Sequence, residues 1–446
     1  MLPKGYSAPR SGVMLSVLVV GVPIIIGVHF VSVTLFGVTS VSYFAKLILW
    51  GSVIVWIPEL ARSVPKIRGA DPRLWMGMFF ATLTVSTVLG LGSRSYESPL
   101  DTLRCLASTA IWCSGLIAIP IIARAQGRSV AQVARALEWL GYLAATTIMC
   151  TMLFPSLAKY GFEVIEYQDG SSRYFGPMGD SSPFLVLPGL FISLTTRKWF
   201  ACAMCVLAVM LTASRSASIV AAIGLSVHCV LGSLYNSEKS RRSIFVTIVS
   251  IVALIVVIMV TVPTYKASMV KLWSRNVSAV EDVQDDRLGG RLNNIDAGWE
   301  LWQERPVFGW GIGGNFESVR TDGMGSSYST GQIVGNATNQ IVQAAAEGGV
   351  FGFTAFTVFL AAVAMMGWKQ ISGRRRRGRE AQGVALFCLA SVVGIQTVVY
   401  VRDLSLVGYV LCIAIGCLVL NEFTTDDCDA GQRAAPRARC RTHSDV

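Results

Sequence analysis

The recurrence of apolar runs about 20 residues long constrains the fold of this chain more than any other feature. Such a run, folded as a helix, is long enough to cross the hydrocarbon core of a bilayer. With 53% hydrophobic and only 15% charged residues, the chain is too apolar for a soluble protein. The sequence therefore predicts an all-α integral membrane protein with about 12 transmembrane helices, or as few as 10 if two short runs do not span.

The runs also set the expected organisation of the chain. The predicted spans are about 12–36, 42–59, 74–92, 104–123, 139–155, 183–196, 199–213, 216–234, 243–263, 341–368, 383–401 and 405–421. The short runs 183–196 and 199–213 could be tilted, re-entrant or a hairpin. We expect one membrane domain over 1–421, with a large loop at about 264–340 between the ninth and tenth spans. The polar tail 422–446 is expected to be disordered.

The placement of Lys and Arg predicts which connections face the cytoplasm. With a cytoplasmic N-terminus, the connections 60–73, 124–138, 197–198, 235–242 and 369–382 lie inside and carry eighteen Lys and Arg residues. The short outer connections carry six: Arg94, Arg104, Lys159, Arg173, Arg215 and Arg402. Both termini are therefore expected inside, and the long loop outside. The net charge of +11 is then mainly a topology signal facing anionic lipid, and we expect no nucleic-acid partner.

Several kinds of chemistry are disfavoured by what the sequence lacks. It has no Walker motif, no dinucleotide fingerprint and no Cys/His metal cluster. Its three histidines lie in predicted spans or in the tail. Most of the eleven cysteines lie within or at the edges of spans, where Cys behaves as a small hydrophobe. We expect no metal and no cofactor.

The long outer loop is predicted to contain a helix and a tight turn. The apolar residues Leu292, Ile295, Trp299 and Trp302 recur at helical spacing between Arg291 and Glu304. Pro306 should end this amphipathic helix, and a turn rich in glycine follows, with Gly309, Gly311, Gly313 and Gly314. Such a helix could equally lie in the membrane interface with its tryptophans at headgroup level.

Two arginines are candidates for holding an anion at the outer membrane surface. Arg215 interrupts an apolar region among small Ser and Ala neighbours, and arginine at membrane depth normally faces an interior or a water-filled cavity. Arg291 begins the loop helix, and its guanidinium fork suits a phosphate or pyrophosphate. The alternatives are a snorkelling Arg215, and a surface salt bridge from Arg291 to Asp286 or Asp296.

A third candidate group lies at the start of the tenth span. Asn339, Gln343 and Glu347 are spaced i, i+4, i+8 and should share one helix face. A carboxylate at membrane depth is a functional candidate by default, and Glu347 could accept a proton from a sugar hydroxyl or bond to a sugar. Helix capping and bonds between helices are the alternative roles.

These residues occur in an order that resembles the O-antigen ligase and polysaccharide polymerase (Wzy-like) family. The resemblance covers roughly 170–355. It rests on Arg291, on Trp299 and Trp302, on Pro306-x-x-Gly309-x-Gly311 and Phe316, and on Glu347-Gly348-Gly349 with Gly352. Ser214-Arg215-Ser216 and Arg173-x-x-Gly176 also resemble family elements.

The resemblance implies a glycosyltransferase of the bacterial inner membrane, with its active site in the periplasm. Such enzymes move glycan from undecaprenyl pyrophosphate to a sugar hydroxyl with inversion and without metal. By this analogy Arg215 and Arg291 are catalytic and hold the pyrophosphate. Glu347 is the third catalytic candidate because of its place at the start of the tenth span. The substrate-binding candidates are Arg173, Trp299, Trp302, Gly309, Gly311, Thr338, Asn339, Gln343 and Arg402.

One departure from the family pattern bears on the reaction. The family's histidine falls on Thr338, and threonine cannot accept a proton at neutral pH. Either Glu347 or another loop carboxylate replaces the histidine, or the acceptor needs no strong base. The loss favours a polymerase of lipid-linked repeat units, for exopolysaccharide, capsule or O-antigen, over a ligase to a lipid or protein acceptor. Chain-length regulators and export proteins are conceivable partners of a polymerase. A transporter or flippase of lipid-linked sugars is the alternative of another class, although it should concentrate polar groups near mid-bilayer.

Overall fold

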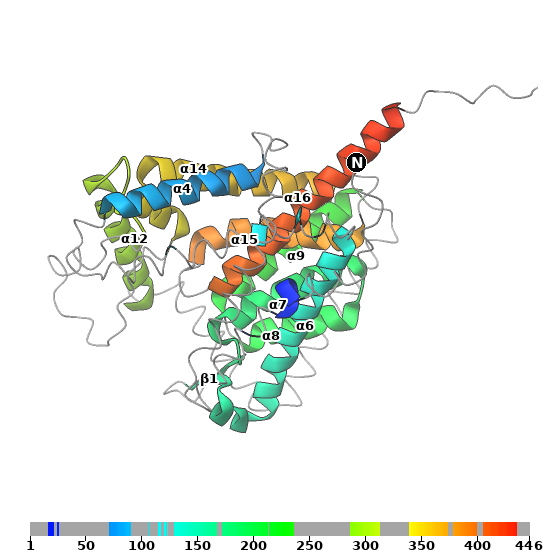
Figure 1. Cartoon of the computed structure of the whole chain (residues 1–446). Coiled ribbons are helices and arrows are strands. Elements are labelled where there is room, and N and C mark those ends of the chain that lie inside the picture. Colours follow the sequence, from blue (N-terminus) through cyan, green and yellow to red (C-terminus); the bar gives the residue numbers. More distant parts are fainter. Residues whose placement is uncertain are drawn as a thin grey trace, which may run out of the picture.

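The protein is a bundle of helices with one small β-hairpin, seen in a computed structural model (Figure 1). The structure describes residues 17–21, 71–90, 129–166, 172–212, 214–235, 286–312, 339–372, 378–398 and 405–434, and a few single residues between 25 and 123. At Arg215 and Arg291 the description covers the backbone. The first described element is a short π-helical turn, η1 (Val17–Gly21).

Most predicted spans that fall on described residues are helices with similar bounds. They are α4 (Pro72–Gly90), α7 (Ser182–Thr196), α8 (Trp199–Leu211), α9 (Arg215–Tyr235), α14 (Gln340–Ser372) and α15 (Arg379–Val398). Among the described residues, α4, α14 and α6 (Val130–Leu153) are long and apolar enough to cross a bilayer. The helical membrane fold is confirmed to that extent. The expected spans 42–59 and 243–263 lie outside the described residues.

Two helices extend beyond the bounds that hydropathy predicted. Helix α6 begins at Val130, nine residues before the predicted span, where the Ser129 N–H donates to the Gln132 side chain over 3.2 Å as part of a capping box. Helix α16 (Ser405–Ala434) continues past the predicted end at 421. It therefore reaches into the segment that we expected to lack regular structure. Lys369 at the end of α14 bonds to Glu422 where α16 leaves the apolar run.

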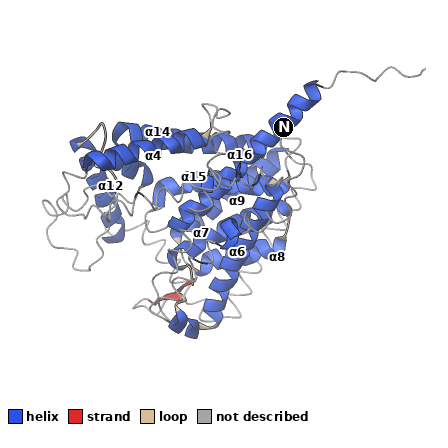
Figure 2. Ribbon diagram, viewed as in Figure 1, coloured by secondary structure: helices blue, strands red, loops and turns tan. Residues whose placement is uncertain are grey.

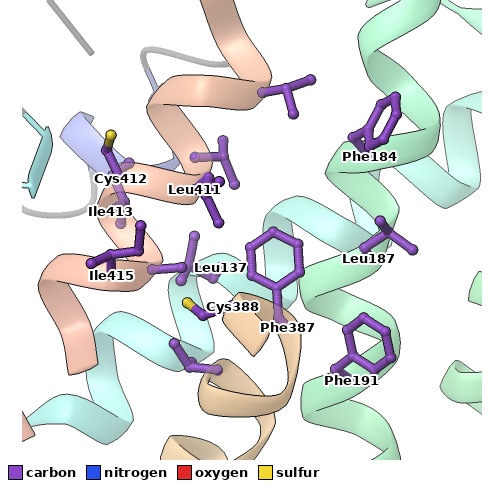
Figure 3. Close-up of a cluster of buried hydrophobic side chains, with 14 of the residues drawn as sticks. Leu137, Phe184, Leu187, Phe191, Phe387, Cys388, Leu411, Cys412, Ile413 and Ile415 are labelled. Carbon is purple, nitrogen blue, oxygen red and sulfur yellow. The ribbon is translucent and has the colours of Figure 1, made fainter. Parts of the chain in front are cut away.

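Helix α7 is the centre of the bundle. Every residue from Ser182 to Leu194 is buried, and α7 contacts α6, α8, α9 and α15. Figure 3 shows its Phe184, Leu187 and Phe191 facing Phe387 of α15. Helices α7 and α8 are joined by Arg197 and Lys198 alone and contact each other. Of the alternatives for these short runs, the hairpin is the one observed.

Small residues let the helix backbones approach closely, as is usual between membrane helices. A Cβ on Gly141 of α6 would lie 2.5 Å from the backbone nitrogen of Gly189 in α7. Where the same helices meet in polar contact, Glu138 is 2% exposed and accepts bonds from Lys198 at 2.7 Å and from Tyr142 at 2.7 Å. The Tyr142 hydroxyl also lies 2.6 Å from that of Ser193 in α7. This network fixes the α7–α8 hairpin against α6.

Helices α4 and α14 form a second part of the bundle, lying side by side along one edge (Figures 1 and 2). Phe79 and Phe356 pack across this pair with ring centroids 5.1 Å apart. Helix α12 (Asp286–Glu304) contacts α14 near its start. The loop helix predicted over 291–304 therefore begins five residues earlier, at Asp286, and ends, as expected, just before Pro306.

One feature of the fold was absent from the all-α expectation. After α6 the chain forms a 3₁₀ turn, η4 (Pro155–Tyr160), and an antiparallel hairpin of β1 (Glu163–Glu166) and β2 (Ser172–Gly176). A further 3₁₀ turn, η5 (Gly179–Ser181), leads into α7. Strands of four and five residues give too little alternation for the sequence to reveal them.

Candidate active site

The candidate site is built around a break in helix α14. Gly349 has φ 61° and ψ −156°, which interrupts the helix after its first nine residues. A break of this kind removes the usual i→i+4 partners of the preceding carbonyl groups. Because Ala346, Glu347 and Gly349 are buried, their backbone groups need partners from elsewhere in the protein.

The turn that follows α12 supplies those partners. The N–H of Trp310 donates to the Ala346 carbonyl, and the N–H of Gly311 to the Glu347 carbonyl, each over 2.8 Å. In return the N–H of Val350 donates to the Pro306 carbonyl over 2.7 Å. The segment 306–311 and the broken helix thus complete each other's hydrogen bonding, which fixes the end of α12 on α14.

The glycines of both motifs are required by this contact. Gly309 and Gly311 have positive φ values of 68° and 80°, which only glycine adopts at little cost. A Cβ on Gly309 would lie 2.5 Å from the Glu347 carbonyl carbon, and one on Gly349 would lie 2.2 Å from the Val307 carbonyl oxygen. In this structure, Gly309 and Gly311 therefore serve the backbone contact between turn and helix.

A third element joins the contact from helix α4. The N–H of Ile312 donates to the hydroxyl of Thr87 over 2.9 Å, and Thr87 is 1% exposed. Sequence reasoning missed Thr87 because a single hydroxyl in an apolar span is usually satisfied within its own helix. Thr87 does make that bond as well, to the Leu83 carbonyl at 2.6 Å. Its second role depends on a tertiary contact that no spacing reveals.

The predicted polar row on α14 is divided between two roles. Asn339 caps the helix, since its side-chain oxygen accepts the N–H of Ile341 at 2.9 Å and of Val342 at 3.2 Å. Gln343 donates from its amide to the Glu347 carboxylate over 2.6 Å. Both Gln343 and Glu347 are buried, at 8% and 7% exposure. The carboxylate is thus held in one orientation, one helical turn from the amide that fixes it.

Helix α12 packs its tryptophan-bearing side near the same break. Leu301 and Trp310 form a buried cluster with Val342 and Ala346 of α14, and Trp299 packs against it. Trp299 and Trp302 meet edge to face, with ring centroids 5.3 Å apart. Helix α12 is therefore attached to the protein body through its apolar side.

The predicted Arg173 lies on strand β2 and contacts the segment that leads to Arg215. Its Nε donates to the carbonyl of Thr212 over 2.8 Å, and its guanidinium lies over the ring of Phe175 at 4.5 Å. Thr212 caps the end of α8, and Arg215 begins α9 three residues later. Two residues far apart in the sequence are thus brought to one region.

The structure describes four other predicted site residues only in their backbone or not at all. The backbone of Arg215 begins α9. The backbone of Arg291 lies in the second turn of α12. Thr338 and Arg402 lie outside the described residues. In the described part of the chain, no three His, Cys, Asp or Glu side chains are grouped as metal ligands would be.

The comparison with known protein families adds an independent observation. Residues 200–357 match the family model described as O-Antigen ligase. The match begins in α8, ends in α14, and includes Arg215, Arg291, both tryptophans, the 306–311 turn and Glu347. No curated protein matches the chain.

The matched segment supports an activity of the O-antigen ligase and polymerase type, a class of glycan-transferring enzymes, and the apolar helices are consistent with an integral membrane protein. The resemblance read from the sequence is therefore confirmed by the family model, which matches residues 200–357 of the chain.

Proposed function

We propose that this protein polymerises lipid-linked oligosaccharide repeat units at the periplasmic face of the bacterial inner membrane. The observation that best supports this proposal is the docking of the 306–311 turn on the break in α14. There the Gly311 N–H donates to the Glu347 carbonyl. This contact ties the end of the arginine-bearing helix α12 to the turn of α14 that holds a buried carboxylate. An anion site and a proton acceptor on two locked helices are what transfer from a pyrophosphate donor requires.

In the proposed reaction the acceptor is a sugar hydroxyl and the leaving group is undecaprenyl pyrophosphate. The hydroxyl oxygen attacks the anomeric carbon of the donor, and the bond from that carbon to the pyrophosphate oxygen breaks with inversion. Arg215 and Arg291 stabilise the charge that develops on the pyrophosphate. The hydroxyl proton passes to the Glu347 carboxylate, which Gln343 keeps in position.

Arg173 has a supporting part in this proposal. By bonding to the Thr212 carbonyl it fixes the turn from α8 to α9, and Arg215 follows directly. The donor pyrophosphate is already an activated leaving group, so the chain needs mainly to orient the two substrates. We propose that the reaction needs neither metal nor cofactor.

Ligation of finished glycan to a lipid or protein acceptor is the second candidate, favoured by the match to the O-antigen ligase family model. The threonine at position 338, where the family has histidine, favours polymerisation. Undecaprenyl-pyrophosphate-linked oligosaccharide is the proposed substrate in both cases. We propose a topology with both termini in the cytoplasm, which gives an outer face to α12 and the turn.

Reconstitution in liposomes tests the proposal. Protein, lipid-linked repeat unit and, in a second series, an acceptor glycolipid would be combined, and the products resolved by size. A ladder of lipid-linked products supports the polymerase, and a single transfer that requires the acceptor supports the ligase. Movement of lipid-linked sugar between leaflets without any new glycosidic bond would instead support the transporter. Arg215→Gln and Arg291→Gln should remove either enzyme product.

A further inference from the structure

An arginine that the sequence did not single out is held rigidly at the end of α12. The Arg305 guanidinium lies 3.8 Å from the centre of the Trp310 ring. That ring is itself fixed, because its Nε1 donates to the Leu301 carbonyl over 3.0 Å and its backbone N–H donates to Ala346. Stacking on an indole that is buried, and that is held by one side-chain and one backbone hydrogen bond, restricts the guanidinium to one plane.

The fork of this arginine has no hydrogen-bond or ion-pair partner among the described residues. In the part of the chain that the structure describes, no hydrogen bond or ion pair engages the Arg305 side chain, and the residue is half-buried. A guanidinium offers five N–H donors and suits a planar, bidentate anion. The Arg305 guanidinium is therefore held in one orientation, and its N–H groups have no acceptor among the described residues.

An anion on the Arg305 side chain would be distinct from the pyrophosphate that Arg291 is proposed to hold. Arg291 and Arg305 are 14 residues apart along the same helical path, which at 1.5 Å per residue is about 21 Å. The backbone bond from Arg305 to Leu301 continues the last turn. One pyrophosphate cannot reach both positions, so an anion on Arg305 would differ from the one proposed for Arg291.

Aromatic residues occupy the interval between the two arginines. Trp299 and Trp302 stand eight and eleven residues after Arg291 and are half-buried. The indole Nε1 of Trp302 is buried without a hydrogen-bond partner in the described structure. The part of the indole ring that stays exposed offers an aromatic face on which the C–H groups of a sugar ring can pack.

From this juxtaposition we propose that Arg305 binds the carboxylate of an acidic sugar in the glycan, with Trp302 packing against a neighbouring sugar. The inference rests on the proposed function, because it assumes that a glycan lies along α12. It adds a substrate class: repeat units that carry a uronic acid or another carboxylate substituent. Exposed Val307 and Phe308 next to Arg305 make lipid phosphate the competing ligand, which the test must separate.

A binding experiment without donor lipid tests this inference apart from the proposed reaction. The full chain would be placed in nanodiscs of zwitterionic lipid and titrated with trigalacturonate or with its uncharged methyl ester, followed by saturation-transfer NMR. The acidic oligomer should bind about tenfold to a hundredfold more tightly than the ester, as expected for charge-assisted hydrogen bonds. Arg305→Gln should remove this preference and Arg305→Lys should retain part of it. Arg379→Gln, at an exposed site on α15, should leave it unchanged.

Three results would overturn the inference. They are equal affinity for both oligomers in the unmodified protein, a preference that survives Arg305→Gln, and a preference lost when anionic phospholipid is added to the nanodisc. The last result would assign Arg305 to lipid phosphate. Thermal unfolding of Arg305→Gln would accompany the titration, and Arg305→Lys keeps the test valid if Arg305→Gln does not fold. A failure of polymerisation would leave these affinities unaffected, so the two proposals fail separately.

Discussion

The backbone N–H of Gly311 donates to the carbonyl of Glu347 over 2.8 Å, which joins a surface turn to a broken helix 36 residues further along the chain. The turn has glycine where the helix approaches, and the helix has glycine where the turn approaches. Two short motifs that look independent in the sequence are therefore two halves of one contact. The following predictions test what depends on it.

Gly349→Ala should destabilise the protein by about 2–4 kcal/mol, since it adds a Cβ 2.2 Å from the Val307 carbonyl and imposes a positive φ on alanine. Gly77→Ala in α4 is the matched control, because no atom lies within 4 Å of the added Cβ. That control should be neutral or slightly stabilising. Thermal unfolding in detergent would measure both, and equal melting temperatures would show that the break tolerates a side chain.

The two single substitutions in the Glu138–Lys198 pair should have unequal effects on stability, because the Glu138 carboxylate is buried. Lys198→Met leaves the carboxylate without its cation, and we expect a loss of about 1–3 kcal/mol, reduced from the value for a fully buried pair because Lys198 is 51% exposed. Glu138→Gln should cost less, and the double variant should be more stable than Lys198→Met alone. Denaturant unfolding would measure the series.

The exposed Arg135–Glu380 pair, at 3.8 Å, supplies the control for that series. Arg135→Met should change stability by less than about 1 kcal/mol. If Lys198→Met proves no more harmful than Arg135→Met, the network around Glu138 does not fix the α7–α8 hairpin.

Gln343→Met should lower kcat about tenfold while KM stays near its original value. The change removes the amide that orients the Glu347 carboxylate over 2.6 Å, and one such bond corresponds to about tenfold in rate. Gln370→Met is the control, since Gln370 is equally buried but bonds to Leu418 and Asn421 of α16. It should lower the melting temperature and spare kcat. A purely structural Gln343 would behave like Gln370.

Arg173→Lys should reduce glycan transfer about tenfold although it preserves the charge. Lysine cannot reproduce the Nε bond to the Thr212 carbonyl or the stacking on Phe175. The turn that leads to Arg215 would then be less fixed. Lys159→Gln removes a charge from the exposed η4 turn and should have little effect in the same assay. Full activity of Arg173→Lys would mean that charge alone matters at this position.

Much of the fold follows from the sequence because hydropathy depends on local composition alone. The bounds of α4, α7 and α9 fall within two residues of the predicted spans. Predictions were weaker where hydropathy gives no signal. The start of α6 at Val130 depends on a capping box, and the β-hairpin pairs residues too few to show alternation. Helix α16 continues through a polar segment in which hydropathy gives no helical signal.

The candidate site shows the same division. The sequence identifies Pro306, Gly309 and Gly311 as a turn, but it does not indicate that the turn fills a break in α14. Nor can spacing reveal that Thr87 accepts a bond from Ile312 or that Arg305 stacks on Trp310. Asn339 illustrates the opposite case, since its position one residue before the helix already suggests the cap that it forms.

The proposed reaction transfers glycan with loss of a pyrophosphate carrier. The most direct measurement counts undecaprenyl pyrophosphate released for each repeat unit added, in liposomes containing the full chain and lipid-linked repeat unit. We predict that one carrier is released per new glycosidic bond and that no added metal is required. Arg291→Gln should abolish the release, and Glu347→Gln should strongly reduce it. Lipid-linked sugar that changes leaflets without any release of carrier would contradict the proposed reaction.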